Sequence, residues 1–120
     1  MELIKIVNAR EVLDSLSNKE NVGAHLSYWM AKFVAKTENE YMFYASEANK
    51  LFDKYGEKKD DGTRFVPAAK ISEFNAAIDA LNKTDVEDPG IRFSLSELSS
   101  ELKMSMKQMY NLLDFVDEEK

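Results

Sequence analysis

The chain of 120 residues contains no cysteine, one histidine, two prolines and four glycines. Without cysteine it can form neither disulfides nor thiolate metal sites, and catalysis by cysteine is excluded. The lone histidine, His25, cannot form a histidine cluster around a metal ion. The scattered glycines form neither a phosphate-binding loop nor a dinucleotide-binding fingerprint. We therefore expect no catalytic site, no metal and no cofactor.

Long apolar runs are also missing. No stretch approaches the roughly 20 consecutive apolar residues of a membrane-spanning helix. The segment Met1–Val7 carries Glu2 and Lys5, so we expect no signal peptide and no membrane contact. Hydrophobic residues at 44% and charged residues at 32% are typical of a soluble globular protein. The length predicts a single domain over residues 1–120.

The net charge of −6 is unevenly distributed. Residues 1–71 contain 11 acidic and 11 basic side chains, whereas residues 72–120 contain 11 acidic and 5 basic ones. An acidic half argues against direct binding to nucleic acid, which needs clustered Lys and Arg. It leaves open a basic protein partner or mimicry of nucleic acid, and the alternative is a merely solubilising surface. The candidate acidic binding residues are Asp85, Glu87, Asp88, Glu97 and Glu101.

One long helix is predicted over Glu20–Tyr55. Its inward positions recur every 3.6 residues on average, which is about the period of an α-helix. These positions are Leu26, Met30, Phe33, Thr37, Tyr41, Tyr44, Ala48, Leu51 and Tyr55. Gly56 is expected to end it in the left-handed conformation. A straight helix of this length would span about 50 Å, against about 35 Å for a compact domain of this size. The helix must therefore break, near Gly23 or Thr37, or one end must project and need a partner.

Shorter elements are predicted on both sides of this helix. The β-branched run Glu2–Val7 favours a strand, followed by a helix from Asn8 to about Ser17; a helix that starts as early as Ile4 is the alternative. Beyond the long helix, Arg64–Val66 favours a short strand after the turn at Asp61-Gly62. The predicted inward side chains are Val12, Leu13 and Leu16 in the first helix, and Ile71, Phe74, Ile78 and Leu81 in a helix over residues 68–82.

The C-terminal region predicts one more strand and two more helices. Alternating Ile91, Phe93 and Leu95 indicate a strand that pairs with the N-terminal one. Capping boxes are predicted at two helix starts, formed by Ser94 with Glu97 and by Ser105 with Gln108. The side chains of the last helix that should point inward are Met106, Met109, Leu113 and Val116. The fold class is mainly α (α+β): one long central helix, three or four shorter helices and a minor two- or three-stranded β element.

Aromatic residues of the long helix are the one group that suggests a function. Tyr28, Trp29 and Phe43 leave the main apolar stripe, which suggests a protein-binding face. The alternative is that these rings belong to the core that receives the other helices. Stacking on single-stranded nucleic acid would need interleaved Lys and Arg, which this helix supplies only thinly.

The chain resembles a type of small uncharacterised protein encoded by bacteriophages and prophages. The resemblance lies in the order of several segments: Lys54-Tyr55-Gly56-Glu57 and Asp61-Gly62, Phe74-Asn75 with residues 81–87, Leu95-Ser96-Glu97-Leu98, Leu102-Lys103, and residues 108–116. It covers about two-thirds of the chain, from the long helix onward. It implies a phage context but no activity or catalytic residue, and it places the protein in the cytoplasm of the host cell or in the virion.

Three hypotheses follow. The first is a non-enzymatic phage accessory protein that acts by protein–protein contact in virion assembly or structure. The second is an acidic inhibitor that blocks a host nucleic-acid-binding or defence protein. An enzyme has little support. The partner is therefore expected to be a phage protein, a host protein or a second copy of the chain.

Overall fold

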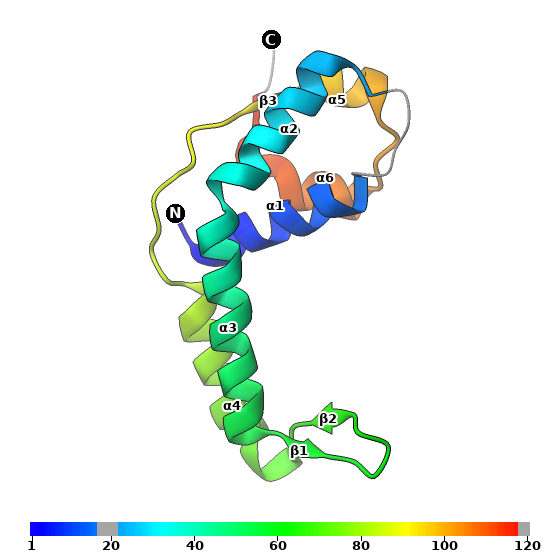
Figure 1. Ribbon diagram of the computed structural model, residues 1–120. Coiled ribbons are helices and arrows are strands. Elements are labelled where there is room, and N and C mark those ends of the chain that lie inside the picture. Colours follow the sequence, from blue (N-terminus) through cyan, green and yellow to red (C-terminus); the bar gives the residue numbers. More distant parts are fainter. Residues whose placement is uncertain (17–21, 118–120) are drawn as a thin grey trace.

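The computed structural model describes residues 1–16 and 22–117. The described residues form a head and an arm (Figure 1). The helices of the head are α1 (Leu3–Leu16), α2 (Ala24–Lys36), α5 (Leu95–Glu101) and α6 (Met106–Leu112), and the arm consists of α3 (Glu38–Tyr55) and α4 (Ala68–Asn82). The longest dimension is 49 Å, and the other two are 32 and 24 Å. The chain is thus mainly helical, and the arm projects from the head.

Helix α1 occupies the segment that was predicted to begin with a strand. That prediction is wrong, and the alternative of an early helix start is confirmed. Leu3, Ile6 and Val7 are all buried, and they recur at helical spacing, so tertiary burial outweighs the strand preference of β-branched residues. The chain end also pairs differently than expected, because Glu2 forms an isolated antiparallel bridge with Asp85.

The predicted helix Glu20–Tyr55 is not one long helix: it breaks at Thr37, one of the two expected positions. There the backbone (φ −105°, ψ 7°) lies between α2 and α3, and Figure 1 shows the bend. The buried Thr37 hydroxyl donates a hydrogen bond of 2.7 Å to the Phe33 carbonyl oxygen. Threonine hydroxyls that bond back to the preceding turn often bend helices. The predicted start at Glu20 lies outside the described residues.

The arm is a helical hairpin with a short β-hairpin at its tip. Strands β1 (Glu57–Lys58) and β2 (Arg64–Phe65) pair antiparallel, with Gly62 at φ 89° in the turn. Helix α4 has the predicted bounds, but Ile71 is 41% exposed whereas Phe74 is buried. Gly56 follows α3 in an extended conformation (φ −91°, ψ 163°), so the predicted left-handed cap is wrong. Glycine fits there because a Cβ atom would lie 2.4 Å from the Phe52 carbonyl oxygen.

The core of the head is built around three rings from distant segments. Phe33 of α2 packs edge-on against Phe115, with ring centroids 4.9 Å apart, and against Phe93, at 5.8 Å. Phe93 lies in β3 (Phe93–Ser94), which pairs in parallel with β4 (Val116–Asp117). The strand predicted around Phe93 therefore exists, but it pairs with the C-terminal end of the chain and not with the N-terminal segment. Leu95 already belongs to α5.

The last helix begins as predicted, and of its four predicted inward residues Met109 and Val116 are half-buried, whereas the other two are exposed. Ser105 and Gln108 form the complete capping box at the start of α6, whereas Ser94 accepts the expected bond from the Glu97 backbone N–H. Met106 is 90% and Leu113 51% exposed, so their predicted inward orientation is wrong. Helix α6 gives way to a 3-10 turn (η1, Leu113–Phe115), whose tighter winding changes the phase of the side chains. The buried side chains there are Leu112 and Phe115.

Candidate protein-binding site

Tyr28 and Trp29 form an exposed aromatic pair on α2. Tyr28 is 57% and Trp29 38% exposed, and their rings meet edge to face with centroids 5.3 Å apart. They remain outside because Leu26, Met30 and Phe33 anchor the opposite side of α2 in the core. An edge-to-face arrangement of two rings is favourable by about 0.5–1.5 kcal/mol. The pair is therefore an exposed aromatic surface available for contact, and these two rings are not part of the buried core.

Trp29 also borders a hollow of about 210 Å³, here called the Trp29 hollow. Side chains from α2, β3, α5 and β4 line it, so segments far apart in the sequence build it together. The lining residues are His25, Leu26, Trp29, Arg92, Phe93, Ser94, Glu97 and Asp117. An aromatic ring beside a few polar and charged groups is a combination often found in binding pockets.

Two polar contacts lie at the Trp29 hollow, a His25–Glu97 contact and an Arg92–Asp88 ion pair. His25 Nδ1 lies 2.9 Å from the Glu97 carboxylate. Arg92 donates two hydrogen bonds to Asp88, of 2.6 and 3.1 Å. Hydrogen bonds from Arg92 and from the Gly90 backbone N–H lower the pKa of Asp88 to about 2. The guanidinium is thus held by a carboxylate that stays ionised at neutral pH, which fixes its position at the rim.

The candidate acidic residues are spread over several places, and most have partners within the chain. Asp85 binds the Met1 amino group at 2.8 Å, and that hydrogen bond lowers the pKa of Asp85. Glu101 accepts a hydrogen bond from a backbone N–H at the start of α2. Glu87 and Asp88 line a second hollow near Thr37, whereas Glu97 lines the Trp29 hollow. The structure therefore does not gather the five carboxylates at one site.

Phe43 is separated from the other two candidate rings by the break at Thr37. It lies on α3 and is 49% exposed. The residues that line the Trp29 hollow do not include it. The structure brings Trp29 and Glu97 together at one hollow and leaves Phe43 on the arm, next to the exposed Met42.

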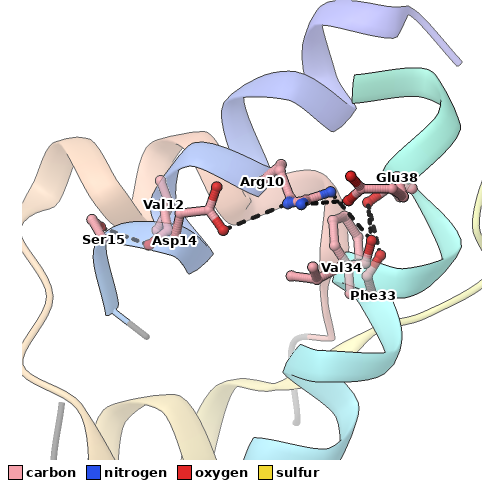
Figure 2. Close-up of polar contacts among 8 residues, drawn as sticks. Arg10, Val12, Asp14, Ser15, Phe33, Val34 and Glu38 are labelled. Carbon is pink, nitrogen blue, oxygen red and sulfur yellow. Dashed lines mark hydrogen bonds and ion pairs between the residues drawn. The ribbon is translucent and has the colours of Figure 1, made fainter. Parts of the chain in front are cut away.

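Sequence reasoning missed Arg10, which organises the junction of head and arm. Figure 2 shows its side chain reaching from α1 toward the start of α3. The guanidinium donates 2.6 Å and 3.2 Å hydrogen bonds to the Glu38 carboxylate and the Val34 carbonyl oxygen, and it lies 3.5 Å from Asp14. It also lies 4.8 Å from the centroid of the Tyr41 ring. Arg10 is only 8% exposed, so the bend is held by a mostly buried charge.

Neither metal-binding groups nor membrane-spanning helices are found in the described part of the chain. Within residues 1–16 and 22–117, no three or more His, Asp or Glu side chains are grouped so that they could hold a metal ion. In the same residues no helix is both long and apolar enough to cross a membrane. Comparison with known protein families, curated proteins and solved structures finds no match to any of them.

Proposed function

We propose that this protein is a non-enzymatic accessory protein that acts by protein–protein contact through the Tyr28–Trp29 pair and the adjoining Trp29 hollow. The observation that carries the proposal is the exposure of two large rings, 57% and 38%, which pack on each other at the edge of that hollow. Trp, Tyr and Arg are the residues most enriched at the energetic centres of protein interfaces. The pair and Arg92 supply all three at one place.

The charges around the hollow suggest the chemistry of the partner. Glu97 and Asp117 line the hollow; Glu97 already contacts His25, and Arg92 is engaged by Asp88. A partner side chain that is apolar and flanked by a basic group would cover Trp29 while its charge meets the Asp117 carboxylate. Charge complementarity of this kind favours selection of the partner more than raw affinity.

The phage context of the proposal comes from the sequence resemblance alone. Within that context we favour a role in virion assembly or structure, in the cytoplasm of the host cell or in the particle. The second candidate is an acidic inhibitor of a host nucleic-acid-binding or defence protein, which the concentration of the net charge of −6 in residues 72–120 favours. The intramolecular partners of Asp85, Asp88, Glu97 and Glu101 argue against it, because each of these carboxylates already has a structural role.

Affinity purification from infected cells, followed by measurement with the purified partner, tests the proposal. The double variant Tyr28→Ala/Trp29→Ala should weaken binding at least ~30-fold, because hot-spot residues contribute about 2 kcal/mol or more. Met42→Ala is the matched control, since Met42 is 60% exposed on the arm, away from the hollow. Circular dichroism should show that each variant retains the helical fold. Unchanged affinity of the folded double variant would refute the proposed face.

The same assay separates the two candidate functions. An assembly protein should co-purify with capsid or tail proteins, and its binding should depend on the two rings. An acidic inhibitor should instead capture a basic host protein, with affinity that falls steeply as salt rises. Glu87 is exposed, so Glu87→Gln should weaken an inhibitor complex and leave an assembly complex unchanged.

A further inference from the structure

The break between α2 and α3 is confined to a single residue. Neither glycine nor proline occurs between residues 24 and 55, although sharp kinks in helices often have such a cause. Two backbone hydrogen bonds of helical spacing already span the break, from the Thr37 N–H to the Phe33 carbonyl oxygen (3.1 Å) and from the Tyr41 N–H to the Thr37 carbonyl oxygen (3.0 Å). A turn of Thr37 from φ −105° and ψ 7° to the helical values of about −63° and −42° would join the two helices into one.

A contact from α1 holds this break open. The Arg10 guanidinium donates a 3.2 Å hydrogen bond to the Val34 carbonyl oxygen. In a continuous helix that carbonyl oxygen would accept a hydrogen bond from the Glu38 N–H instead, because helical bonds join residues four apart. Arg10 also binds the Glu38 carboxylate at 2.6 Å. The bend therefore depends on a contact with another helix, while the apolar stripe of the sequence continues through it.

The bend separates two parts of the chain that pack against each other. Residues 1–36 contain α1 and α2, and residues 38–117 contain all the other described elements. The rings in the core of the head meet across this division, because Phe33 belongs to the first part and Phe93 and Phe115 belong to the second. If the bend straightened within a single copy, these rings would separate and become exposed to water, which is unfavourable. A straight helix therefore needs the same surfaces from another molecule.

We infer that two copies of this chain exchange residues 1–36 when the bend straightens. The contacts within the monomer are then remade between the copies, so the dimer needs no new complementary surface. The 2.8 Å contact of the Met1 amino group with Asp85 is one of those that are remade. The exchange is symmetrical and stops at a dimer. Two continuous helices over residues 24–55, each about 48 Å long at roughly 1.5 Å per residue, join the two halves.

In the exchanged dimer each Trp29 hollow is shared between the two copies. The part of its lining that includes Trp29 comes from α2, whereas the rest comes from β3, α5 and β4 in the second part of the chain. Each hollow therefore combines α2 of one copy with the other walls from its partner. The exchange does not depend on the proposed function, because a hollow that binds no partner would be remade in the same way. Equally, a chain that stays monomeric keeps its hollow intact.

Sedimentation velocity after refolding from urea tests the exchange, because unfolded chains can fold into either form. Wild-type protein refolded at increasing concentrations should give an increasing fraction of dimer and no larger species. Residue 37 lies inside a helix only in the dimer, and it does so in both copies. Thr37→Ala should therefore dimerise about 20-fold more tightly than Thr37→Gly, as the helix propensities of the two residues imply. The exposed Ala45 lies within α3 in both forms, so Ala45→Gly should dimerise like the wild type.

A cross-link between two chains identifies the exchange directly. The side chains of Lys5 on α1 and Asp114 on η1 are each 44% exposed and lie 3.5 Å apart, and the chain has no cysteine of its own. A Lys5→Cys chain refolded together with an Asp114→Cys chain should give a dimer in which a short bis-maleimide joins these two positions. Lys5→Cys refolded with Lys59→Cys, at the tip of the arm, is the matched control and should give no such link.

Three outcomes would overturn the inference. The first is a wild type that stays monomeric up to millimolar concentration after refolding. The second is an equal dimer constant for the two Thr37 variants, and the third is a dimer without the cross-link between positions 5 and 114. The cross-link needs no substitution at the bend, so it decides the question even if circular dichroism shows that a Thr37 variant does not fold.

Discussion

Replacement of Arg10 by methionine should destabilise the protein and loosen the bend between α2 and α3. Arg10 is 8% exposed, and its guanidinium connects α1 to both sides of the bend. The Val34 carbonyl oxygen belongs to the last turn of α2, where orphan carbonyl groups need donors from elsewhere. Glu38 opens α3. Methionine keeps much of the apolar stem of arginine but removes every donor.

The size of the effect follows from these contacts. A charged hydrogen bond to a carbonyl contributes about 1.5–3 kcal/mol. The ion pair with Glu38, which is 47% exposed, adds only about 0.5 kcal/mol because solvent screens it. The cation–π contact with Tyr41 adds about 0.5–1 kcal/mol. Removing the guanidinium also removes the cost of burying its charge, which offsets about 1 kcal/mol or more of this loss. The net loss of stability should therefore be about 2 kcal/mol.

Urea unfolding followed by circular dichroism measures this loss. Arg10→Met should reduce the free energy of unfolding by about 2 kcal/mol and lower Tm by about 8 °C for a chain of this length. Glu38→Gln is the control and should cost no more than about 1 kcal/mol, since its side chain returns to water. A loss below about 0.5 kcal/mol for Arg10→Met would refute the argument that Arg10 holds the bend.

Two further predictions concern the C-terminal region. In urea unfolding, Leu112→Ala should lower the free energy of unfolding by about 2–5 kcal/mol and Leu113→Ala by about 0.5 kcal/mol or less. The reason is that Leu112 is fully buried and Leu113 is 51% exposed. Equal losses would show that Leu112 is not the buried residue of the two. Asp88 has a folded-state pKa of about 2, below the unfolded value near 3.9, so its stabilisation is present above about pH 4 and is lost as the pH falls through about 2. NMR titration should show the Asp88 midpoint rising toward about 4 in Arg92→Gln, and an unchanged midpoint would exclude Arg92 as the cause.

The sequence predicted the structure well where apolar residues recur at a regular helical spacing and where the interacting residues lie close together in the chain. The bounds of α4 follow from its spacing, and the box of Ser105 and Gln108 marks the start of α6 because both partners lie within four residues. Length alone left open a break near Gly23, a break near Thr37 or a projecting end, because an unbroken helix would exceed a compact domain, and the predicted single long helix is wrong. The bounds of α4 and the start of α6 depend on backbone geometry and short-range hydrogen bonds, which a single sequence contains.

The errors arise where distant segments decide the outcome. Whether residues 2–7 form a strand or a helix depends on what covers them, and the burial of Leu3 and Ile6 favours the helix. The face that α6 buries depends on the 3-10 turn that follows it and on the site where Phe115 docks against Phe33. A period shows that one side of a helix is apolar, but not which neighbour covers that side.

The candidate site was predicted in part for the same reason. Exposure of Tyr28 and Trp29 follows from their position off the main stripe of the helix. The meeting of Trp29 with Glu97 could not be foreseen, because it needs α5 to lie against the start of α2. A helix that begins at Asn8 gives no sign of a role for Arg10. Had α1 been extended back to Leu3, Arg10 would have stood out as a charge on the buried face.

The bend at Thr37 lets α2 stay on the head while α3 leaves it. The inward stripe of α2 continues without a phase change into α3, yet α2 buries Leu26, Met30 and Phe33 in the head, whereas α3 has no fully buried residue. A straight helix could not keep its first half on the head while its second half followed α4. The Trp29 hollow exists only while α2 rests on β3 and α5, which supply its other walls. The burial of Leu26, Met30 and Phe33 therefore holds the shape of that hollow, while the contacts of Arg10 hold the bend from which the arm leaves the head.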